Sequence, residues 1–337
     1  MKRYTVPSAQ GIDSLTLAEA DTPRPGRGQA LVRMRAASLN YRDLMIVRGG
    51  YARGGVPPGL VPLSDGAGEV VEVGESVTRV RPGDRVAGIF MQSWIGGEIG
   101  PDHHASALGG AIDGVLAEYV LFDADGLVHI PEALSYEEAA TLPCAAVTAW
   151  NALFAQGPVL PGQTVLTLGT GGVSMFAVQF AHAAGARVIV TSSSQDKLDQ
   201  ALALGAAEGI DYRAEPEWQD AVQRLTGGRG VDHVIELGGA GTLARSIHAA
   251  RIGGSVHMIG VITGAAEIDP MPIMRRGLTV RGVFVGSREM FEAMNRAIAY
   301  HDLHPVIDRI FPFADAAAAY RHLESQAHVG KVVIRVD

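Results

Sequence analysis

The chain has 337 residues, of which 47% are hydrophobic and 19% are charged, a composition typical of globular proteins and a length that suggests two domains. Its net charge of −8, with no run of lysine or arginine, argues against nucleic acid or an anionic membrane as the main partner. Every apolar run falls short of about 18 residues and the N-terminus lacks an apolar signal core, so we expect no membrane span and a cytoplasmic protein. The single cysteine, Cys144, excludes an internal disulfide and a four-cysteine zinc site.

The first 120 residues or so are predicted to be rich in β-structure. Residues 30–39, "ALVRMRAASL", alternate between two faces, as a half-buried strand does. The stretch "GEVVEVGESVTRVRPGDRVAGI" predicts two strands separated by a Pro82-Gly83-Asp84 turn. These patterns predict a small, strongly bent antiparallel barrel.

From about residue 163, short β-branched runs alternate with helical patterns. The strands are predicted at "TVLTL", "RVIVT", "VDHVIEL", "SVHMIGV" and "LTVRGVFVG", with helices near 197–204, 216–226 and 240–250. This alternation predicts a parallel, doubly wound sheet, so the fold class is α/β. The helix "REMFEAMNRAIAYH", the segment "AAAAYRHLES" and a last strand "KVVIRV" are expected to return to the first domain.

A glycine turn lies between the first of these strands and its helix, in "VLTLGTGGVSMF" (165–176). Backbone N–H groups of such a turn, at a helix N-terminus, bind the pyrophosphate of a dinucleotide. The third glycine of the G-x-G-x-x-G pattern is replaced by Ser174, whose small side chain is a tolerable departure. The alternative is a structural turn that binds no nucleotide. The predicted cofactor contacts here are Gly169, Thr170, Gly171, Gly172 and Val173.

The next strand favours NADP(H) over NAD(H). Sites for NAD place an acidic residue after this strand, where it binds the ribose hydroxyls and repels a 2′-phosphate. Here the position is Ser192, which lies 192 − 169 = 23 residues after the first glycine. Hydroxyls and a lysine can donate to phosphate oxygens. The expected phosphate contacts are Ser192, Ser193, Lys197 and Tyr212, with Arg213 beside them. The alternative is that the serines only cap the next helix, with Ser194 as the N-cap.

Several segments along the chain together match one family. They are "AASLNYRDLMIVRGGY" (36–51), "PLSDGAGEVVEVG" (62–74), "VRPGDRVAG" (80–88), "DGVLAEYVL" (113–121), "AATLPCAAVTAWNAL" (139–153), the glycine turn and "HVGKVVI" (328–334). On these segments the whole chain resembles the medium-chain dehydrogenase/reductase superfamily, and within it the zinc-independent quinone oxidoreductase and enoyl reductase-like branch.

This resemblance implies a GroES-like catalytic domain formed by residues 1–143 and 287–337, and a Rossmann domain formed by residues 144–286. It also implies a cleft between them and a homodimer formed through the edge strands of the Rossmann sheets, here "LTVRGVFVG". Further cofactor contacts follow from the resemblance alone: Thr148 near the nicotinamide, and Phe284, Val285, Gly286 and Lys331 along the cofactor groove.

The sequence departs from the zinc alcohol dehydrogenases at their catalytic metal. By resemblance, Asn40 and Ser64 stand where two of three zinc ligands would be, and only Cys144 matches a ligand. Hydroxyl and amide groups are poor zinc ligands compared with thiolate and imidazole. The four cysteines of the structural zinc lobe are also missing. His103 and His104 are adjacent and point apart, so we expect no metal, and we expect Cys144 to be a small buried hydrophobe rather than a nucleophile.

Without a metal, hydrogen-bond donors must stabilise the negative charge that develops on a hydride acceptor, which suits a quinone or an activated C=C bond. Tyr41 is the predicted proton donor or oxyanion partner, and Asn40 the amide that orients the substrate. Tyr51 is expected on the opposite wall, with Ser64 and Asp65 in the former metal region. The alternative for Tyr41 is a packing role beside an Arg42–Asp43 ion pair, which would leave water as the proton source.

These observations lead to an NADPH-dependent, zinc-independent reductase that acts on a small-molecule quinone or α,β-unsaturated carbonyl compound. One alternative is an alcohol or aldehyde dehydrogenase of the same fold, which the lost ligands disfavour. Another is an NADPH-binding regulatory protein with little turnover. Its nucleic-acid-binding form is disfavoured by the charge of −8.

Overall fold

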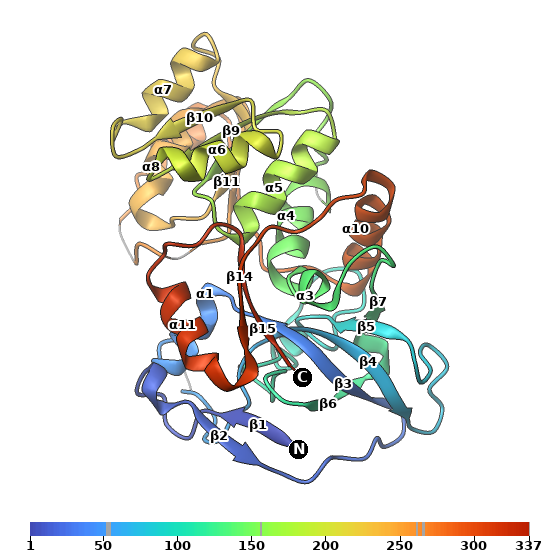
Figure 1. The fold of residues 1–337 in the computed structure, drawn as a ribbon. Helices are drawn as coiled ribbons and strands as arrows, with labels where there is room; N and C mark the ends of the chain where they lie inside the picture. The colour runs from blue at the N-terminus through green and yellow to red at the C-terminus, as the bar shows by residue number, and fades with distance from the viewer. Residues whose placement is uncertain (52–54, 156, 261, 265–266, 337) are drawn as a thin grey trace. The chain divides into compact units, whose positions relative to one another are not determined.

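The structure is a computed structural model that describes residues 1–51, 55–155, 157–260, 262–264 and 267–336. The chain divides into two units, which are Met1–Val147 with Val285–Asp337, and Thr148–Phe284 (Figure 1). We call them unit 1 and unit 2. The sequence had placed these boundaries at 143/144 and 286/287.

Unit 1 is built on a seven-stranded sheet in the order β14-β15-β3-β4-β5-β7, with β6 paired to β3. Only the β14–β15 pair is parallel. The register between β3 and β4 shifts twice, and such irregularities bend a strand. The predicted antiparallel barrel is thus a bent, mainly antiparallel sheet whose end strands β14 and β7 are not paired with each other. The strands of this sheet are β3 (Gln29–Ser38), β4 (Asp65–Val73), β5 (Arg85–Gly88), β6 (Tyr119–Asp123), β7 (Leu127–His129), β14 (Ile307–Pro312) and β15 (Lys331–Arg335). Strands β1 (Lys2–Thr5) and β2 (Thr16–Glu19) pair with each other in a separate antiparallel sheet.

Helices and the apolar faces of these strands enclose the core of unit 1. The fully buried side chains of Met34, Phe122 and Tyr320 come from β3, β6 and a C-terminal helix, so the two chain segments of the unit share one core. The helices are α1 (Tyr41–Val47), α2 (Pro101–His104), α3 (Tyr136–Ala139), the π-helical turn η3 (Leu142–Ala146), α10 (Arg288–His301) and α11 (Ala316–Glu324), with short 3-10 turns η1 (Ile12–Ser14), η2 (Ala124–Gly126) and η5 (Phe313–Asp315). The short helix α4 (Val147–Trp150) lies at the unit boundary.

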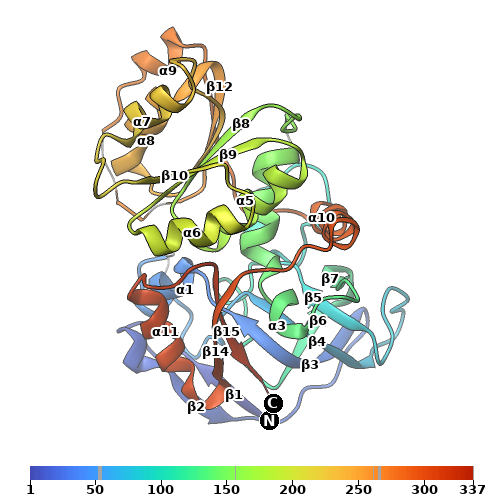
Figure 2. The ribbon, with the colours of Figure 1, turned by 45° about the horizontal axis from the view of Figure 1, so that its top comes forward.

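Unit 2 contains the predicted doubly wound sheet. Its six strands are all parallel in the order β10-β9-β8-β11-β12-β13, which is the 3-2-1-4-5-6 order of dinucleotide-binding folds. The strands are β8 (Thr164–Leu168), β9 (Arg187–Ser192), β10 (Glu208–Asp211), β11 (Val231–Glu236), β12 (Ala250–Met258) and β13 (Thr279–Gly282). The helices are η4 (Asn151–Ala155), α5 (Gly172–Ala183), α6 (Gln195–Ala203), α7 (Trp218–Leu225), α8 (Ala240–Ala249) and α9 (Met271–Arg275). Figure 2 shows α5 and α6 on one face of this sheet and α7 and α8 on the other.

The predicted helices near 197–204, 216–226 and 240–250 are confirmed as α6, α7 and α8, and α10 covers the predicted "REMFEAMNRAIAYH". Strand β13 is shorter than the predicted edge strand "LTVRGVFVG" and ends at Gly282. Three residues later Val285 has a φ of 45°, which an extended strand does not allow. No helix within the described ranges is long and apolar enough to cross a lipid bilayer.

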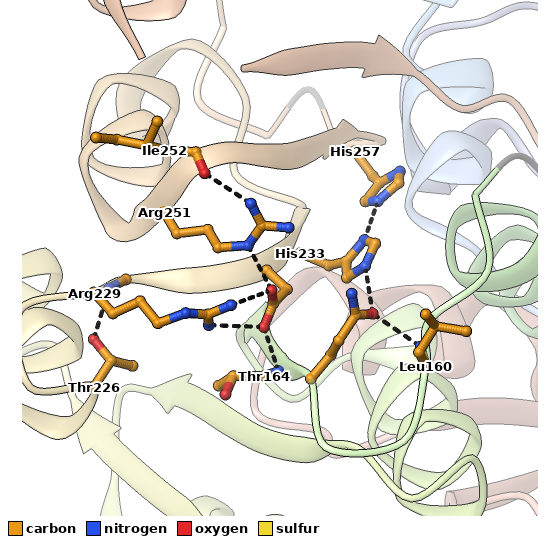
Figure 3. A network of polar contacts seen from close by, with 11 residues as sticks. Leu160, Thr164, Thr226, Arg229, His233, Arg251, Ile252 and His257 are labelled. Carbon is orange, nitrogen blue, oxygen red and sulfur yellow. Dashed lines mark hydrogen bonds and ion pairs between the residues drawn. The ribbon is translucent and has the colours of Figure 1, made fainter. Parts of the chain in front are cut away.

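A polar network braces the edge of unit 2 where strands β8 and β11 begin (Figure 3). The Asp232 carboxylate, 2% exposed, accepts hydrogen bonds from the Thr164 amide at 2.9 Å, from Arg229 and from Arg251 Nε at 2.6 Å. Next to it, His233 Nδ1 lies 3.2 Å from His257 Nε2. These contacts join β8, β11 and β12 at one edge of the sheet. The glycine turn lies at the opposite edge, after the carboxyl end of β8.

Candidate functional site

Three strands of unit 1 meet where the predicted catalytic residues lie. Ser38, the last residue of β3, pairs with Asp65, the first residue of β4, and with Val333 of β15. This register brings Asn40, which follows β3, toward Asp65 and toward Lys331 at the start of β15. We call Asn40, Ser64, Asp65, Cys144 and Lys331 the polar cluster.

Lys331 is the member of the polar cluster that the sequence had assigned elsewhere. Its side chain is 3% exposed, and its Nζ donates to the Leu39 carbonyl and to Asn40 Oδ1, both at 2.6 Å. The sequence predicted a contact with the cofactor for this residue. The structure instead places its ammonium group against Asn40 within unit 1, and this placement leaves the cofactor role a prediction.

Asp65 is a fully buried carboxylate with a donor on each oxygen. Ser64 Oγ donates to Oδ1 at 2.6 Å, and the Cys144 amide donates to Oδ2 at 3.0 Å. That amide is available because Cys144 lies in the first turn of η3, where N–H groups have no partner inside the helix. Burial raises the pKa of Asp65, and the Lys331 charge and the Ser64 hydrogen bond act in the opposite direction.

Cys144 lies beside this carboxylate, to which it donates its backbone N–H, and the residue as a whole is half-buried. Burial of the thiol raises its pKa far above the usual range, and the negative charge of Asp65 adds to the effect. A raised pKa favours the neutral thiol, which is a poor nucleophile. That Cys144 has no nucleophilic role stays a prediction.

Helix α1 carries the remaining polar groups. Its capping residue Asn40 donates its backbone N–H to Asp43 Oδ2 at 2.7 Å. Burial raises the pKa of Asp43 to about 6, although the Arg42 charge opposes this shift. Arg42 Nη1 lies 3.9 Å from Asp43 Oδ1, so the ion pair that the sequence offered as an alternative is present.

The Arg42 guanidinium lies between two aromatic rings, 4.7 Å from the Tyr51 centroid and 4.5 Å from the Phe90 centroid. Arg42 Nη1 donates a hydrogen bond to the Leu108 carbonyl at 2.9 Å. Burial raises the pKa of Tyr51, and the Arg42 charge limits the increase. Tyr41, in contrast, is half-buried and packs against the hydrophobic core. Tyr51 therefore has a charged neighbour that the sequence did not reveal.

The glycine turn of unit 2 has the geometry expected of an anion-binding site. Gly169 has a φ of 74°, and a Cβ added at Gly169 or Gly171 would meet nothing within 4 Å, so the backbone above the turn is open. Helix α5 begins at Gly172. Ser174 is 1% exposed and donates its hydroxyl to the Leu168 carbonyl at 2.8 Å, which explains how serine fits at the third glycine position. Thr170 is also buried, while Val173 is half-buried in the first turn of α5.

The predicted phosphate contacts lie at the carboxyl edge of β8, β9 and β10. Strand β9 ends at Ser192, one residue later than predicted, and Ser192 is 2% exposed. Its Oγ lies 3.5 Å from Thr170 Oγ1, and its carbonyl accepts the Tyr212 amide at 3.0 Å. Ser193 and Lys197 are half-buried beside this point, and Tyr212 is 41% exposed. Ser194 does occupy the N-cap of α6, but its side chain makes no capping hydrogen bond.

The remaining predicted cofactor residues lie at the unit boundary. Thr148 is buried where unit 2 begins, and Phe284 is 41% exposed where unit 2 ends. Val285 belongs to unit 1, is buried, and has a φ of 45°, a strained conformation for a β-branched residue. Their common role stays a prediction.

Sequence reasoning missed Glu236, the last residue of β11. This carboxylate is fully buried and accepts hydrogen bonds from the Gly238 amide at 2.8 Å and the Gly239 amide at 2.9 Å. The hydroxyls of Thr242 and Ser246 also donate to it. Glu236 thus orders the loop at the carboxyl edge next to β8. The signal was present, since an acidic residue at a strand end is followed by two glycines in "VIELGG".

Two family models match the chain. The model described as "Alcohol dehydrogenase GroES-like domain" matches residues 26–132, and the model described as "Zinc-binding dehydrogenase" matches residues 172–299. A zinc-type alcohol dehydrogenase-like protein of Schizosaccharomyces pombe is 45% identical over 344 residues, which cover 99% of each chain. The expected GroES-like and Rossmann folds are thereby confirmed.

Solved structures of two kinds resemble the chain. A crystal structure described as an NAD-dependent alcohol dehydrogenase has a TM-score of 0.91 and 32% identity, and covers 100% of both chains. The Escherichia coli quinone oxidoreductase complexed with NADPH has a TM-score of 0.84 and 25% identity, and also covers 100% of both chains.

Proposed function

The chain belongs to the medium-chain dehydrogenase/reductase superfamily, in its zinc-type alcohol dehydrogenase-like branch, and on that premise we propose that this oxidoreductase uses NADPH to reduce a quinone or an α,β-unsaturated carbonyl compound without zinc. The observation that carries the proposal is the polar cluster, which holds a lysine and amide and hydroxyl groups where zinc-type relatives would hold a metal.

A nicotinamide cofactor fits the carboxyl edge of unit 2. The open backbone at Gly169 and Gly171 and the N-terminus of α5 would hold the pyrophosphate. The preference for NADPH is supported by Ser192 in the place of a ribose-binding carboxylate, with Lys197 and Tyr212 nearby. The structure of the NADPH-bound relative agrees with this choice, while the NAD-dependent relative keeps NADH as the alternative.

Zinc does not fit the polar cluster. Asn40 and Ser64 offer an amide and a hydroxyl, which are poor zinc ligands, so Cys144 is the one position of the three that offers a good zinc ligand. In the part of the chain that the structure describes, no group of three His, Cys, Asp or Glu side chains could hold a metal ion. We therefore assign no catalytic step to a metal.

The residues of unit 1 would instead polarise the acceptor. Bound NADPH supplies the hydride. As charge grows on the acceptor oxygen, the Asn40 amide stabilises it by donating a hydrogen bond, and a tyrosine hydroxyl adds a second donor or the proton. Tyr41 is the first candidate for that hydroxyl because it follows Asn40, and Tyr51 is the second because Arg42 lies over its ring. Ser64 and Asp65 complete the polar cluster, in which the Ser64 hydroxyl donates a hydrogen bond to Asp65.

Two further assignments accompany this proposal. We expect a homodimer formed through β13, the edge strand of the parallel sheet, and a cytoplasmic location. Both follow from the family resemblance and the sequence, and sedimentation of the purified protein would test the first.

The test is an NADPH-oxidation screen of quinones, enones, enoyl thioesters and aldehydes, together with elemental analysis. We expect turnover on quinones or enones by protein that contains no zinc. About one tightly bound zinc per chain, with activity lost on chelation, would instead support the second candidate, an alcohol dehydrogenase, which the names of several relatives favour.

A further inference from the structure

We propose that Lys331 is a positioning residue that fixes the Asn40 carboxamide in one orientation, with Nδ2 presented as the donor to the carbonyl oxygen of the acceptor. This inference rests on the proposed reduction of a carbonyl-bearing acceptor. It differs from the cofactor contact that the sequence suggested for Lys331, and it adds a residue from the far end of the chain to the catalytic unit.

The orientation follows from the chemistry of the two groups. An ammonium group has donors only, so the atom that faces it in a carboxamide must be the oxygen. Lys331 Nζ lies 2.6 Å from Asn40 Oδ1, a charge-assisted hydrogen bond, and 2.6 Å from the Leu39 carbonyl. The second bond anchors the ammonium group to the backbone beside Asn40, so the amide cannot rotate without losing its partner.

The backbone of Asn40 is held as well. Its N–H donates to Asp43 Oδ2 at 2.7 Å as the cap of α1. Leu39 donates its N–H to the Val332 carbonyl at 3.0 Å, which ties the same segment to β15. Backbone and side chain are therefore both fixed, and the direction of Nδ2 follows.

Asn40 Nδ2 carries two N–H groups, and Asp65 accounts for one of them at most. Nδ2 is buried and makes no hydrogen bond of standard length and angle, although the Asn40 side chain interacts with Asp65 closely enough to lower the pKa of that carboxylate against the effect of burial. Asp65 also accepts hydrogen bonds from Ser64 and from the Cys144 amide. A buried donor left unsatisfied is costly. A substrate oxygen that gains negative charge would complete the bonding of the second N–H group.

The choice of lysine also calls for an explanation. It is one of three lysines in a chain with 28 basic residues, and it is 3% exposed. Burying an ammonium group is unfavourable unless it is paired. A merely structural position at the start of β15 could use an apolar residue, whereas only a donor can hold Asn40 Oδ1.

The test compares Lys331→Met, Asn40→Ala, Asn40→Asp and the double variant Lys331→Met/Asn40→Ala on the acceptor that the wild type reduces best. The control is Lys2→Met, at an exposed lysine in the same unit. We expect Lys331→Met to lower kcat tenfold or more, while the NADPH dissociation constant changes less than twofold. In the Asn40→Ala background, Lys331→Met should lower kcat no further, because its effect passes through Asn40.

Asn40→Asp keeps an oxygen for Lys331 but removes the donor, so kcat should fall as far as in Asn40→Ala. Full turnover of Asn40→Asp would overturn the role of Nδ2. A tenfold rise in the NADPH dissociation constant of Lys331→Met at unchanged kcat would overturn the proposal in favour of a cofactor contact. Independent losses in the double variant would show that Lys331 does not act through Asn40. If Lys331→Met does not fold, the Asn40→Asp result decides.

Failure of the proposed function would look different. In that case the wild type would reduce none of the acceptors, although it binds NADPH. The Lys331–Asn40 pair would then be tested by urea unfolding of the wild type, Lys331→Met, Asn40→Ala and the double variant. Non-additive shifts of the unfolding midpoints would support coupling between Lys331 and Asn40, and additive shifts would overturn it.

Discussion

At the scale of single residues, we expect the choice between NADPH and NADH to depend on one position. Ser192 ends β9, and its neutral hydroxyl lies 3.5 Å from that of Thr170, where NAD sites have a carboxylate. Ser192→Asp should restore the ribose ligand and place a negative charge against a 2′-phosphate, so preference should move toward NADH by tenfold or more. Fluorescence titration of both cofactors at two salt concentrations measures this change.

Lys197→Ala provides the complementary variant. A charge-assisted hydrogen bond to phosphate is worth about 1.5–3 kcal/mol, so NADPH binding should weaken by about tenfold or more while NADH binding stays the same. The difference should shrink as salt increases, because Lys197 is only half-buried. Equal affinities of the wild type for NADPH and NADH would show that Ser192 and Ser193 belong to the cap of α6 and do not bind a phosphate.

The two tyrosines of unit 1 can be separated by kinetics. Tyr41 packs against the core, whereas Tyr51 has the Arg42 guanidinium 4.7 Å from its ring. Loss of one oxyanion donor typically lowers kcat by about 10²–10³. If Tyr41 is that donor, Tyr41→Phe should lower kcat by this amount with little change in the NADPH dissociation constant. A Tyr41→Phe enzyme with normal kcat, next to an impaired Tyr51→Phe enzyme, would assign the role to Tyr51.

At the scale of elements, the short connection before β4 sets the position of Ser64 and Asp65. Leu63 is fully buried with a φ of 69°, a conformation that non-glycine residues seldom adopt. A Cβ at Gly114 would lie 2.0 Å from the Leu63 carbonyl oxygen, so two segments of unit 1 pack backbone to backbone here. The absence of a side chain at Gly114 is therefore a condition for the geometry of the cluster.

Gly114→Ala should lower both stability and turnover, since the Leu63 segment must move and carry Ser64 with it. We expect a loss of about 1–3 kcal/mol, the usual range for overpacking. Gly50→Ala is the matched control, because a Cβ at Gly50 would lie 3.9 Å from the Met45 carbonyl oxygen, an ordinary contact distance. Urea unfolding and kcat measure the two effects. Equal stability of the two variants would contradict the proposed constraint.

Sequence patterns predict the elements well and the polar contacts poorly. The helices α6, α7 and α8 follow from apolar periodicity, and the glycine turn follows from the strand before it and the helix after it. Lys331 could not be placed in this way, because its bond to the Leu39 carbonyl joins residues 292 positions apart. The Arg42 position between Tyr51 and Phe90 likewise depends on side chains that meet only in three dimensions. Asn40, Ser64 and Asp65 were predicted because the resemblance covers their motifs.

At the scale of the whole molecule, the two units should respond to acid in opposite directions. In unit 2, burial lowers the pKa of His257 to about 4, and it lowers the pKa of His233 as well. The unfolded chain binds these protons near pH 6.5, so stability is complete above that pH and is lost as the pH falls toward 4. For His257 alone the loss at pH 5 is about 2 kcal/mol.

Unit 1 has the reverse linkage. Burial raises the pKa of Asp43 to about 6, above its unfolded value, so the folded state takes up a proton first as the pH falls. The contribution of Asp43 to stability is complete below about pH 4 and is lost as the pH rises through 6. Between pH 7 and pH 5 unit 1 should gain about 1 kcal/mol from this group. The raised pKa of buried Asp65 acts in the same direction.

Tryptophan fluorescence can follow the two units separately during urea unfolding. Trp94 is buried in unit 1 and Trp218 in unit 2, so variants that keep only one of the three tryptophans report on one unit each. From pH 7 to pH 5 the midpoint reported by Trp218 should fall and that reported by Trp94 should rise, so that a single transition separates into two. His257→Gln removes a titrating group from unit 2 and should reduce the fall at Trp218 without changing the response at Trp94. Midpoints that move together in every variant would show that the units unfold as one and that neither the buried histidines nor Asp43 controls its own unit.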